Sequence, residues 1–229
     1  MSLPLRWGVV AVAAIAAMAL PPAVVIMRAQ ASPRAVPPPE TADFGAQVPS
    51  PQARRLGGWI ARTRDNRGAD FILIDKKLAE IHVFDAQARL RASSPVLLGS
   101  TPGDDTIPGI GQRPLAAIHA HERTTPAGRF VAEPGRNLRD EDVLWVSYAD
   151  ALSMHPVLTT NPDERRLERL ATPTPDDNRV SYGCINIPTE FFQATMRPLL
   201  GSRPVVYILP ETRTLDEVFA MRPGQRHAS

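Results

Sequence analysis

The chain has 229 residues and a formal net charge of +2. At about 100–200 residues per domain, this length allows one domain with appendages or two small domains. The charged fraction of 22% and the mean hydropathy of -0.17 exclude a multi-span membrane protein and a wholly disordered chain. The balance of 26 Lys and Arg against 24 Asp and Glu gives no general case for nucleic-acid binding. A single cysteine excludes an intrachain disulfide framework.

The N-terminal segment, residues 1–31, has the order of an export signal. Arg6 precedes an apolar stretch over 7–20, and small residues at 29–31 form a small-x-small cleavage pattern. This order predicts a secretory signal peptide. The alternative is a single uncleaved membrane anchor, because the 21 residues of 7–27 are long enough to span a bilayer. Both readings place the remaining chain outside the cytoplasmic membrane, in the periplasm or cell envelope.

The remaining sequence predicts one mainly β domain. Residues 32–67 form a Pro-rich linker that ends in a short helix over 56–62. Short alternating or apolar runs then predict strands at 71–74, 80–84, 115–119, 129–132, 143–147 and 205–209. Their spacing favours a β-sandwich or open barrel over 68–211. His82 shares a strand with Ile81 and Val83 but lies on the opposite face, so we expect it at the surface.

Three short helices are expected in the second half of the chain. Asn161 and Pro162 are typical of a helix start, and this helix extends to Leu170. A second helix begins at 188 or 189 and turns Phe192 and Met196 inward. A third begins with the capping box 214–217, inside the C-terminal tail 212–229.

Cys184 is the main candidate for chemistry. It follows Gly183 and precedes a predicted helix start. A thiol with an ordinary pKa near 8.5 is only about 3% thiolate at pH 7, so a reactive cysteine needs an imidazolium or a helix N-terminus to lower that pKa. Gly183 permits a backbone whose N–H groups face one point, as an oxyanion site requires. The alternative is that Cys184 is a small buried hydrophobe.

His155 is the best candidate for a histidine partner of Cys184. His155 ends an apolar segment and begins a loop, where catalytic residues concentrate. His227 lies in a polar tail, and we expect it to be solvated. His119 and His121 would share a strand face that suits a metal, but a third ligand is not evident, so we expect no metal and no cofactor.

Together these segments resemble the L,D-transpeptidase catalytic domain family (YkuD type). The resemblance covers about 71–209 and rests on Ser181-Tyr-Gly-Cys-Ile-Asn186 with His155 upstream, on Thr125-Pro-Ala-Gly-Arg-Phe130 and on the hairpin 75–84. Three features depart from the family pattern. Tyr182 stands where the family usually has His, Pro156 follows the histidine, and 25 residues separate His155 from Ser181, a longer spacer than usual.

The resemblance implies a mechanism on peptidoglycan stem peptides. Cys184 would attack the amide carbonyl of the third residue of a tetrapeptide stem, and His155 would take and return the proton. Backbone N–H groups of Tyr182, Gly183 and Cys184 would bind the oxyanion. Ser181 and Asn186 would orient the loop, and Ser181 could also assist His155. A second stem or a lipoprotein lysine would accept the acyl group.

Other functions remain open. A hydrolase or L,D-carboxypeptidase would use the same scaffold with water as acceptor, and the departures from the family pattern allow a non-catalytic wall-binding module. Within the long spacer, Arg165, Arg166 and Arg169 are candidates for a lid that contacts stem-peptide carboxylates. The alternative is a solvated helix face. The acidic pairs 104–105 and 176–177 lie in Gly- and Pro-rich loops, and we expect them to be solvated.

Overall fold

Strand β1 (Phe71–Asp75) is buried on both faces at the middle of the larger sheet. The computed structural model describes residues 39–137 and 139–221. Because successive side chains of a strand point to opposite faces, Ile72 and Ile74 enter one hydrophobic core while Phe71 and Leu73 enter another. The strand therefore separates two cores and fixes the layer order of the fold.

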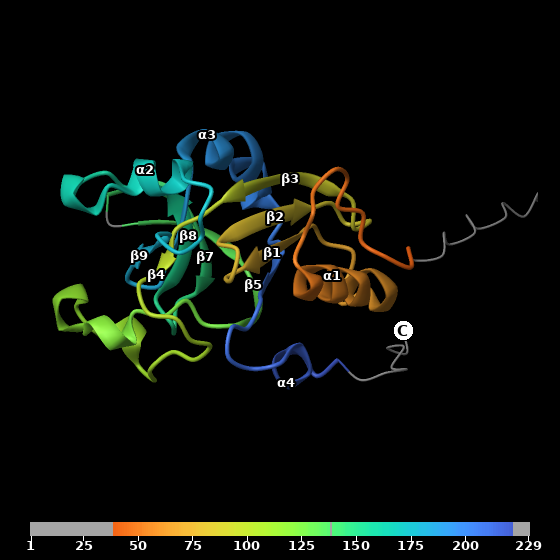
Figure 1. The fold of residues 1–229 in the computed structure, drawn as a ribbon, viewed down its shortest axis with the longest axis horizontal. Helices are drawn as coiled ribbons and strands as arrows, with labels where there is room; N and C mark the ends of the chain where they lie inside the picture. The colour runs from red at the N-terminus through yellow and green to blue at the C-terminus, as the bar shows by residue number, and fades with distance from the viewer. Residues whose placement is uncertain (1–38, 138, 222–229) are drawn as a thin grey trace, which may run out of the picture. The chain divides into compact units, whose positions relative to one another are not determined.

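Two sheets form the β layers (Figure 1). The five-stranded sheet has the order β3-β2-β1-β11-β5, with β2 at Glu80–Phe84, β3 at Leu90–Pro95, β5 at Gly128–Val131 and β11 at Val205–Ile208. The four-stranded sheet has the order β10-β8-β7-β6, with β6 at Glu133–Arg136, β7 at Asp142–Ser147, β8 at Leu152–Pro156 and β10 at Ile185–Ile187. A small parallel pair joins β4 (Leu98–Gly99) to β9 (Arg179–Ser181).

The first core contains side chains from both large sheets. Ile72 from one sheet and Met154 from the other belong to it, and both are fully buried. Phe192 and Met196 also belong to it, as the sequence predicts. They come from a helical run made of α3 (Thr189–Phe191), the π-helical turn η5 (Phe192–Met196) and the 3-10 turn η6 (Arg197–Gly201).

The second core joins the outer face of the five-stranded sheet to two helices. Helix α1 (Pro51–Thr63) is longer than the predicted 56–62, because Ser50 caps it and Pro51 occupies its first turn. Leu56 packs in the same cluster as Phe71 and Phe219. Phe219 belongs to α4 (Leu215–Phe219), which begins with the predicted capping box of Thr214 and Glu217. Segments on both sides of 68–211 therefore contribute to its core, and α1 lies beside β1 in Figure 1.

The described residues confirm a mainly β architecture with a few short helices, but two local predictions are wrong. Residues 115–119 form no strand; they belong to a run of 3-10 turns, η1 (Ile110–Gln112), η2 (Leu115–Ala117) and η3 (Ala120–Glu122). Leu115 is 63% exposed while Ile118 is buried, a pattern that three-residue turns give and that the predicted strand does not need. His82 is buried, because Phe44 from the preceding segment covers it edge to face at 5.5 Å.

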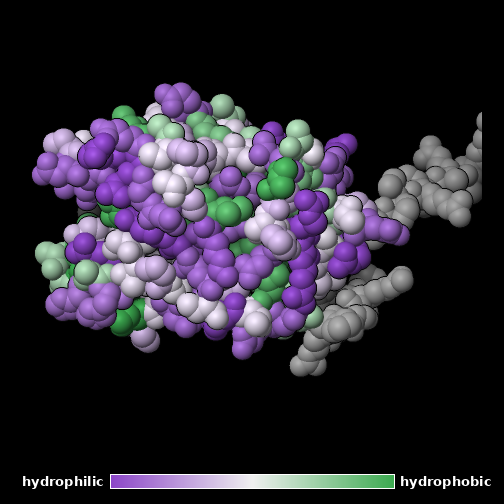
Figure 2. Space-filling model, viewed as in Figure 1, coloured by the Kyte–Doolittle hydropathy of each residue, from purple (hydrophilic) through white to green (hydrophobic). Residues whose placement is uncertain are grey.

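The predicted export segment, 1–31, and His227 lie outside the described residues. No helix within 39–137 or 139–221 is long and apolar enough to cross a bilayer. The face in Figure 2 is mostly hydrophilic, with apolar residues scattered over it.

Candidate active site

The register of two parallel strands brings Cys184 beside β8. Ile185 of β10 pairs with Met154, and Asn186 pairs with His155. Ile185 and Met154 are fully buried in the core, so the alternate positions point to the other face. On that face the Cys184 Sγ lies 3.4 Å from the Ser153 Oγ. Strand alternation therefore gathers Ser153, His155, Cys184 and Asn186 on one side of the sheet.

The His155 ring is oriented by its own strand end. Its Nδ1 lies 2.8 Å from the Pro156 carbonyl oxygen. A carbonyl can only accept, so Nδ1 carries the proton and donates, which leaves Nε2 for the thiol. Pro156 departs from the family pattern, but its carbonyl still selects the tautomer that a base for Cys184 needs.

The thiol and the imidazole shift each other's pKa in the directions that favour an ion pair. Burial works to raise the pKa of the Cys184 thiol, but hydrogen bonding to His155, the charge of that ring and Ser153 outweigh it, so the pKa lies below the ordinary value. Burial works to lower the pKa of His155, but its hydrogen bond and charge interaction with Cys184 raise it above the ordinary value. The Cys184 residue as a whole is half-buried.

Ser181 holds the loop that carries Cys184. Its Oγ accepts a hydrogen bond from the Gly183 N–H at 3.0 Å and donates to the Cys184 carbonyl at 2.6 Å. The hydroxyl is thus directed to the loop backbone and not to His155. Since the Gly183 N–H is engaged by Ser181, the N–H groups of Tyr182 and Cys184 are the better candidates for the oxyanion site.

Gly183 is required by both its backbone conformation and its surroundings. Its φ is +128°, and a Cβ there would lie 2.9 Å from the Thr124 carbonyl oxygen. L residues rarely adopt this φ, and backbone cannot yield as a flexible side chain can. The close approach of two backbone segments therefore requires glycine before the nucleophile.

Tyr182, which replaces the usual histidine, packs against an arginine that the sequence analysis did not single out. The Arg123 guanidinium lies 3.8 Å from the centroid of the Tyr182 ring, a cation–π contact. Tyr182 is 36% exposed, so this contact lies at the surface beside the nucleophile loop. The substitution thus fixes a ring and a positive charge next to Cys184.

The three spacer arginines do not act as one group. The predicted helix over 161–170 is broken at Arg165, whose φ is +48°, into the 3-10 turn η4 (Pro162–Glu164) and α2 (Arg166–Ala171). Arg166 donates to the Asn186 Oδ1 at 2.5 Å, and the Asn186 amide donates to the Cys184 carbonyl at 3.3 Å. Arg169 donates to the Glu164 carbonyl at 2.7 Å, and Arg165 pairs with Glu168 at the surface. Only Arg166 among the three contacts a predicted site residue.

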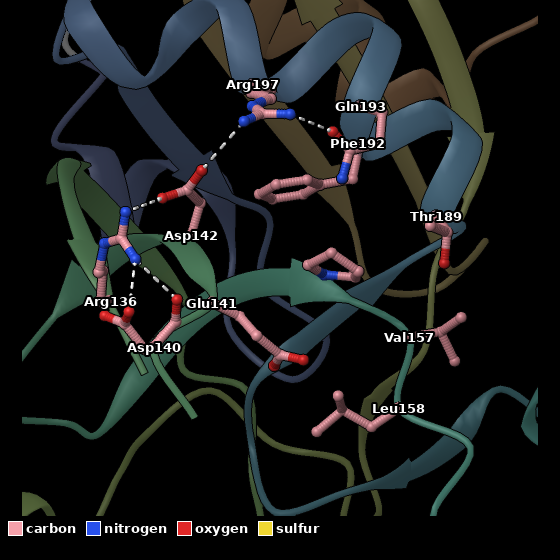
Figure 3. Close-up of a pocket in the computed structure, with 11 residues that line it drawn as sticks. Arg136, Asp140, Glu141, Asp142, Val157, Leu158, Thr189, Phe192, Gln193 and Arg197 are labelled. Carbon is pink, nitrogen blue, oxygen red and sulfur yellow. Dashed lines mark hydrogen bonds and ion pairs between the residues drawn. The ribbon is translucent and has the colours of Figure 1, made fainter. Parts of the chain in front are cut away.

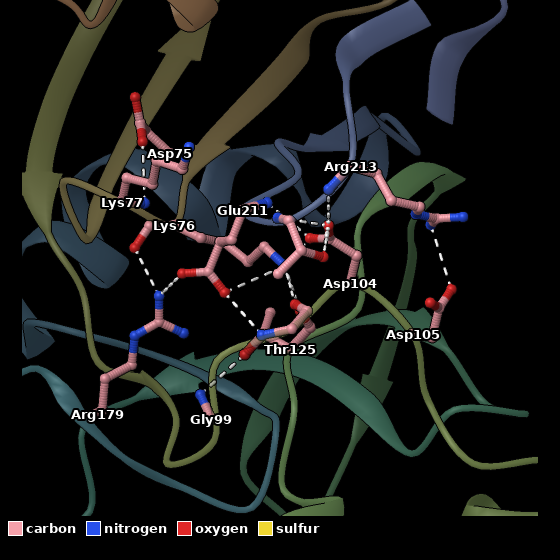
Figure 4. A network of polar contacts seen from close by, with 12 residues as sticks. Asp75, Lys76, Lys77, Gly99, Asp104, Asp105, Thr125, Arg179, Glu211 and Arg213 are labelled. Atoms are coloured by element: carbon pink, nitrogen blue, oxygen red, sulfur yellow. Dashed lines mark hydrogen bonds and ion pairs between the residues drawn. The ribbon is translucent and has the colours of Figure 1, made fainter. Parts of the chain in front are cut away.

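Behind the loop lies a buried polar network that the sequence did not predict (Figure 4). Lys76 and Asp104 form an ion pair at 2.9 Å with both side chains fully buried. The expectation that Asp104 is solvated is therefore wrong, because the turn after β1 places a lysine against it. Lys76 also donates to the Thr125 carbonyl at 2.9 Å, and the Thr125 hydroxyl donates to the Gly183 carbonyl at 2.7 Å. The resemblance marked Thr125, but only its contacts reveal this role.

No group of three or more His, Cys, Asp or Glu within the described ranges could hold a metal ion. His119 and His121 stack with ring centroids 5.7 Å apart, on a 3-10 turn instead of a strand face.

A cavity of about 540 Å³ opens where β8 ends at Pro156 (Figure 3). Val157, Leu158 and Phe192 form an apolar part of its wall, and the remaining wall includes charged side chains of both signs and the polar Thr189 and Gln193. In the close-up, Asp142 points between Arg136 and Arg197, at 3.7 Å from each. This mixed lining suits a ligand that carries both an amine and a carboxylate.

No known family profile matches the sequence, and no curated protein matches it. Among solved structures, the chain is similar to the Enterococcus faecium L,D-transpeptidase, with 14% identity over 62% of this chain and 50% of that chain and a TM-score of 0.36. It is also similar to that enzyme's catalytic domain acylated by ertapenem, with 15% identity over 62% of this chain and 97% of that chain and a TM-score of 0.34. A third is the helical cell shape determining protein Pgp2 from Campylobacter jejuni, with 16% identity over 68% of this chain and 55% of that chain and a TM-score of 0.40.

The chain spans about half the length of the first of these solved structures. At TM-scores of 0.40 and below, this likeness says nothing about the activity of the chain.

Proposed function

We propose that this chain is a cysteine acyltransferase that acts on peptidoglycan stem peptides in the cell envelope and forms crosslinks by L,D-transpeptidation. The observation that carries the proposal is the strand register that places Cys184 beside β8 on the same face as His155, whose Nδ1 lies 2.8 Å from the Pro156 carbonyl oxygen and leaves Nε2 for the thiol. The lowered pKa of the thiol and the raised pKa of the imidazole agree with this geometry. The motif around Cys184 and the Thr125–Phe130 segment supply the substrate class by resemblance. A buried structural cysteine would have a raised pKa instead, because burial disfavours the charged form.

In the first half-reaction, the Cys184 thiolate adds to the amide carbonyl of the third stem residue. The C–S bond forms as the carbonyl π electrons move to oxygen, and the resulting oxyanion is bound by loop N–H groups. The oxyanion then collapses and the C–N bond breaks. The leaving D-alanine amine takes the proton from the His155 imidazolium, which leaves a thioester on Cys184 and a neutral imidazole.

In the second half-reaction, an amine attacks the thioester carbonyl. Neutral His155 takes a proton from this amine, a new amide bond forms, and the C–S bond breaks to restore thiolate and imidazolium. The acceptor would be a side-chain amine of a second stem or of a lipoprotein. We propose that the mixed-charge cavity at Pro156 receives part of a peptide. Arg166, which pairs with Glu164 and donates to Asn186, is the spacer arginine that we propose approaches a substrate carboxylate.

Intact mass after exposure to ertapenem tests the nucleophile. The wild-type protein should gain one drug mass, and Cys184→Ala should gain none. Ser153→Ala is the matched control, because it removes a side-chain hydroxyl that lies 3.4 Å from the sulfur but keeps the sulfur, and it should still be acylated. A folded wild-type protein that gains no mass would contradict the proposal and favour a wall-binding module.

The hydrolase alternative is tested by products. Purified tetrapeptide muropeptides should give crosslinked dimers with the wild-type protein. Tripeptides without dimers would show that water, not an amine, resolves the thioester, and would assign the chain as an L,D-carboxypeptidase.

A further inference from the structure

We propose that Thr125 is a positioning residue that holds the Gly183–Cys184 peptide in the one orientation in which the Cys184 N–H can bind the oxyanion. This proposal rests on the acyl-transfer function proposed above and adds a residue outside the Cys–His pair.

The direction of the Thr125 hydroxyl proton follows from its two contacts. The Gly99 N–H lies 2.8 Å from the Thr125 Oγ1, and the Gly183 carbonyl oxygen lies 2.7 Å from the same atom. A backbone N–H can only donate and a carbonyl can only accept. The hydroxyl therefore accepts from Gly99 and sends its own proton to Gly183, so its rotation is fixed without water.

The hydrogen bond from Thr125 to the Gly183 carbonyl also fixes the direction of the Cys184 N–H, which belongs to the same peptide group. In a planar trans peptide the carbonyl and the N–H point in opposite directions. With its carbonyl held by Thr125, this peptide directs the Cys184 N–H away from Thr125. Ser181 meanwhile engages the Gly183 N–H and the Cys184 carbonyl. Two hydroxyls thus anchor the peptide groups on either side of the nucleophile.

The loop needs such an anchor because of Gly183. A glycine at φ +128° has access to both signs of φ, so the peptide that follows it could rotate and present its carbonyl to the substrate. A carbonyl there would repel an oxyanion. The hydrogen bond from Thr125 is lost in the rotated state, and this loss favours the productive orientation.

Thr125 is itself immobilised by the buried network of Figure 4. It is fully buried, and its carbonyl accepts from the Lys76 Nζ at 2.9 Å. Lys76 also donates to the Gly103 carbonyl and to Asp104. Segments distant in sequence therefore converge on Thr125, with Lys76 on its carbonyl and Gly99 and Gly183 on its hydroxyl, which is the property expected of a support for a site.

The test compares two reactions of the same sulfur in the full chain. Alkylation by iodoacetamide needs only a thiolate, whereas acylation by ertapenem also develops an oxyanion. Thr125→Val keeps the β-branched shape but removes the hydroxyl. It should lower the acylation rate by about 10- to 100-fold, while the alkylation rate and its pH profile stay within about threefold. Thr125→Ser keeps the hydroxyl and should restore acylation.

Equal loss of both reactions in Thr125→Val, or no loss of acylation, would overturn the proposal. Circular dichroism monitors folding, and Thr125→Ala is the second variant with the same two readouts if Thr125→Val does not fold. A wild-type protein that is alkylated but never acylated would refute the proposed function itself. A wild-type protein that is acylated, with Thr125→Val equally fast, would refute only the role of Thr125.

Discussion

Cys184 lies beside Ser153, with their Sγ and Oγ atoms 3.4 Å apart, at the point where β10 begins to pair with β8. The site is therefore made by strand register. A shift of one residue would turn Cys184 toward the core and Ile185 toward the solvent, because strand side chains alternate. The long spacer between His155 and Ser181 leaves this register unchanged, since the chain leaves the four-stranded sheet after β8 and re-enters it only at β10.

Removal of the imidazole should make the thiol less reactive. In His155→Ala, the burial that raises the pKa of Cys184 remains while the charge and hydrogen bond that lower it are lost. The pH at half-maximal iodoacetamide alkylation should move upward, and the rate at pH 7 should fall by about 10-fold or more. His119→Ala, on the 3-10 turn, is the control and should leave the profile in place. An unchanged profile in His155→Ala would show that another group ionises the thiol.

Arg166 should act on both substrate binding and the ionisation of His155. Its positive charge lowers the pKa of His155, so Arg166→Gln should raise that pKa further and move the basic limb of the activity profile to higher pH. The KM for stem peptide should also rise several-fold through loss of a charged contact. Arg165→Gln removes an equal charge from an exposed pair with Glu168 and should change neither quantity. If both variants behave alike, the contact with Asn186 has no special role.

The glycine before the nucleophile should not accept a side chain. Gly183→Ala places a Cβ 2.9 Å from the Thr124 carbonyl oxygen at a φ that alanine rarely adopts, so acylation should fall by more than about 10-fold. Gly201→Ala is the matched control, because nothing lies within 4 Å of a Cβ there. Rates of acylation and thermal melting curves measure the two effects. Wild-type acylation in Gly183→Ala would mean that the loop adopts another conformation in solution.

The buried ion pair should stabilise the fold. Asp104→Asn removes the carboxylate nearest to the buried Lys76 charge and should lower the free energy of unfolding by about 3 kcal/mol or more. Asp105→Asn removes a neighbouring exposed carboxylate, which lies 3.2 Å from Arg213, and should cost less than about 1 kcal/mol. Urea unfolding of the two variants gives the comparison. Equal effects would mean that burial of the pair adds nothing.

The contribution of the Lys76–Asp104 ion pair to stability depends on pH through the Asp104 carboxylate. Burial works to raise the pKa of Asp104, but hydrogen bonds from Thr212, the Glu211 N–H and Lys76 hold it well below the ordinary value. Because the pKa of Asp104 is lower in the folded than in the unfolded protein, its carboxylate stabilises the fold fully at any pH above the unfolded pKa. This stabilisation is lost as the pH falls through the pKa of the folded protein. The difference between wild type and Asp104→Asn should therefore persist at neutral pH and shrink only in strong acid.

The sequence by itself determined the features that depend on neighbours along the chain. The apolar run of β1, the alternation of β2, the capping box at Thr214 and the glycine before Cys184 are local patterns. The strands and the helix start lie where these patterns predict them, but the exposure that the alternation of β2 predicts for His82 is wrong. The choice of Cys184 and His155 as partners came from motif resemblance. These features were predictable because backbone geometry and side-chain periodicity act over a few residues.

Tertiary structure decided which of these residues meet. The burial of His82 depends on Phe44, the ion pair of Lys76 depends on Asp104, and the direction of the Cys184 N–H depends on Thr125. Arg166 alone of the three spacer arginines reaches the site, because the chain breaks at Arg165. Each of these contacts joins positions far apart in sequence. The packing of loops and turns that the fold brings together, not local propensity, sets their geometry, and burial with the charges and hydrogen bonds that this packing supplies sets the pKa shifts.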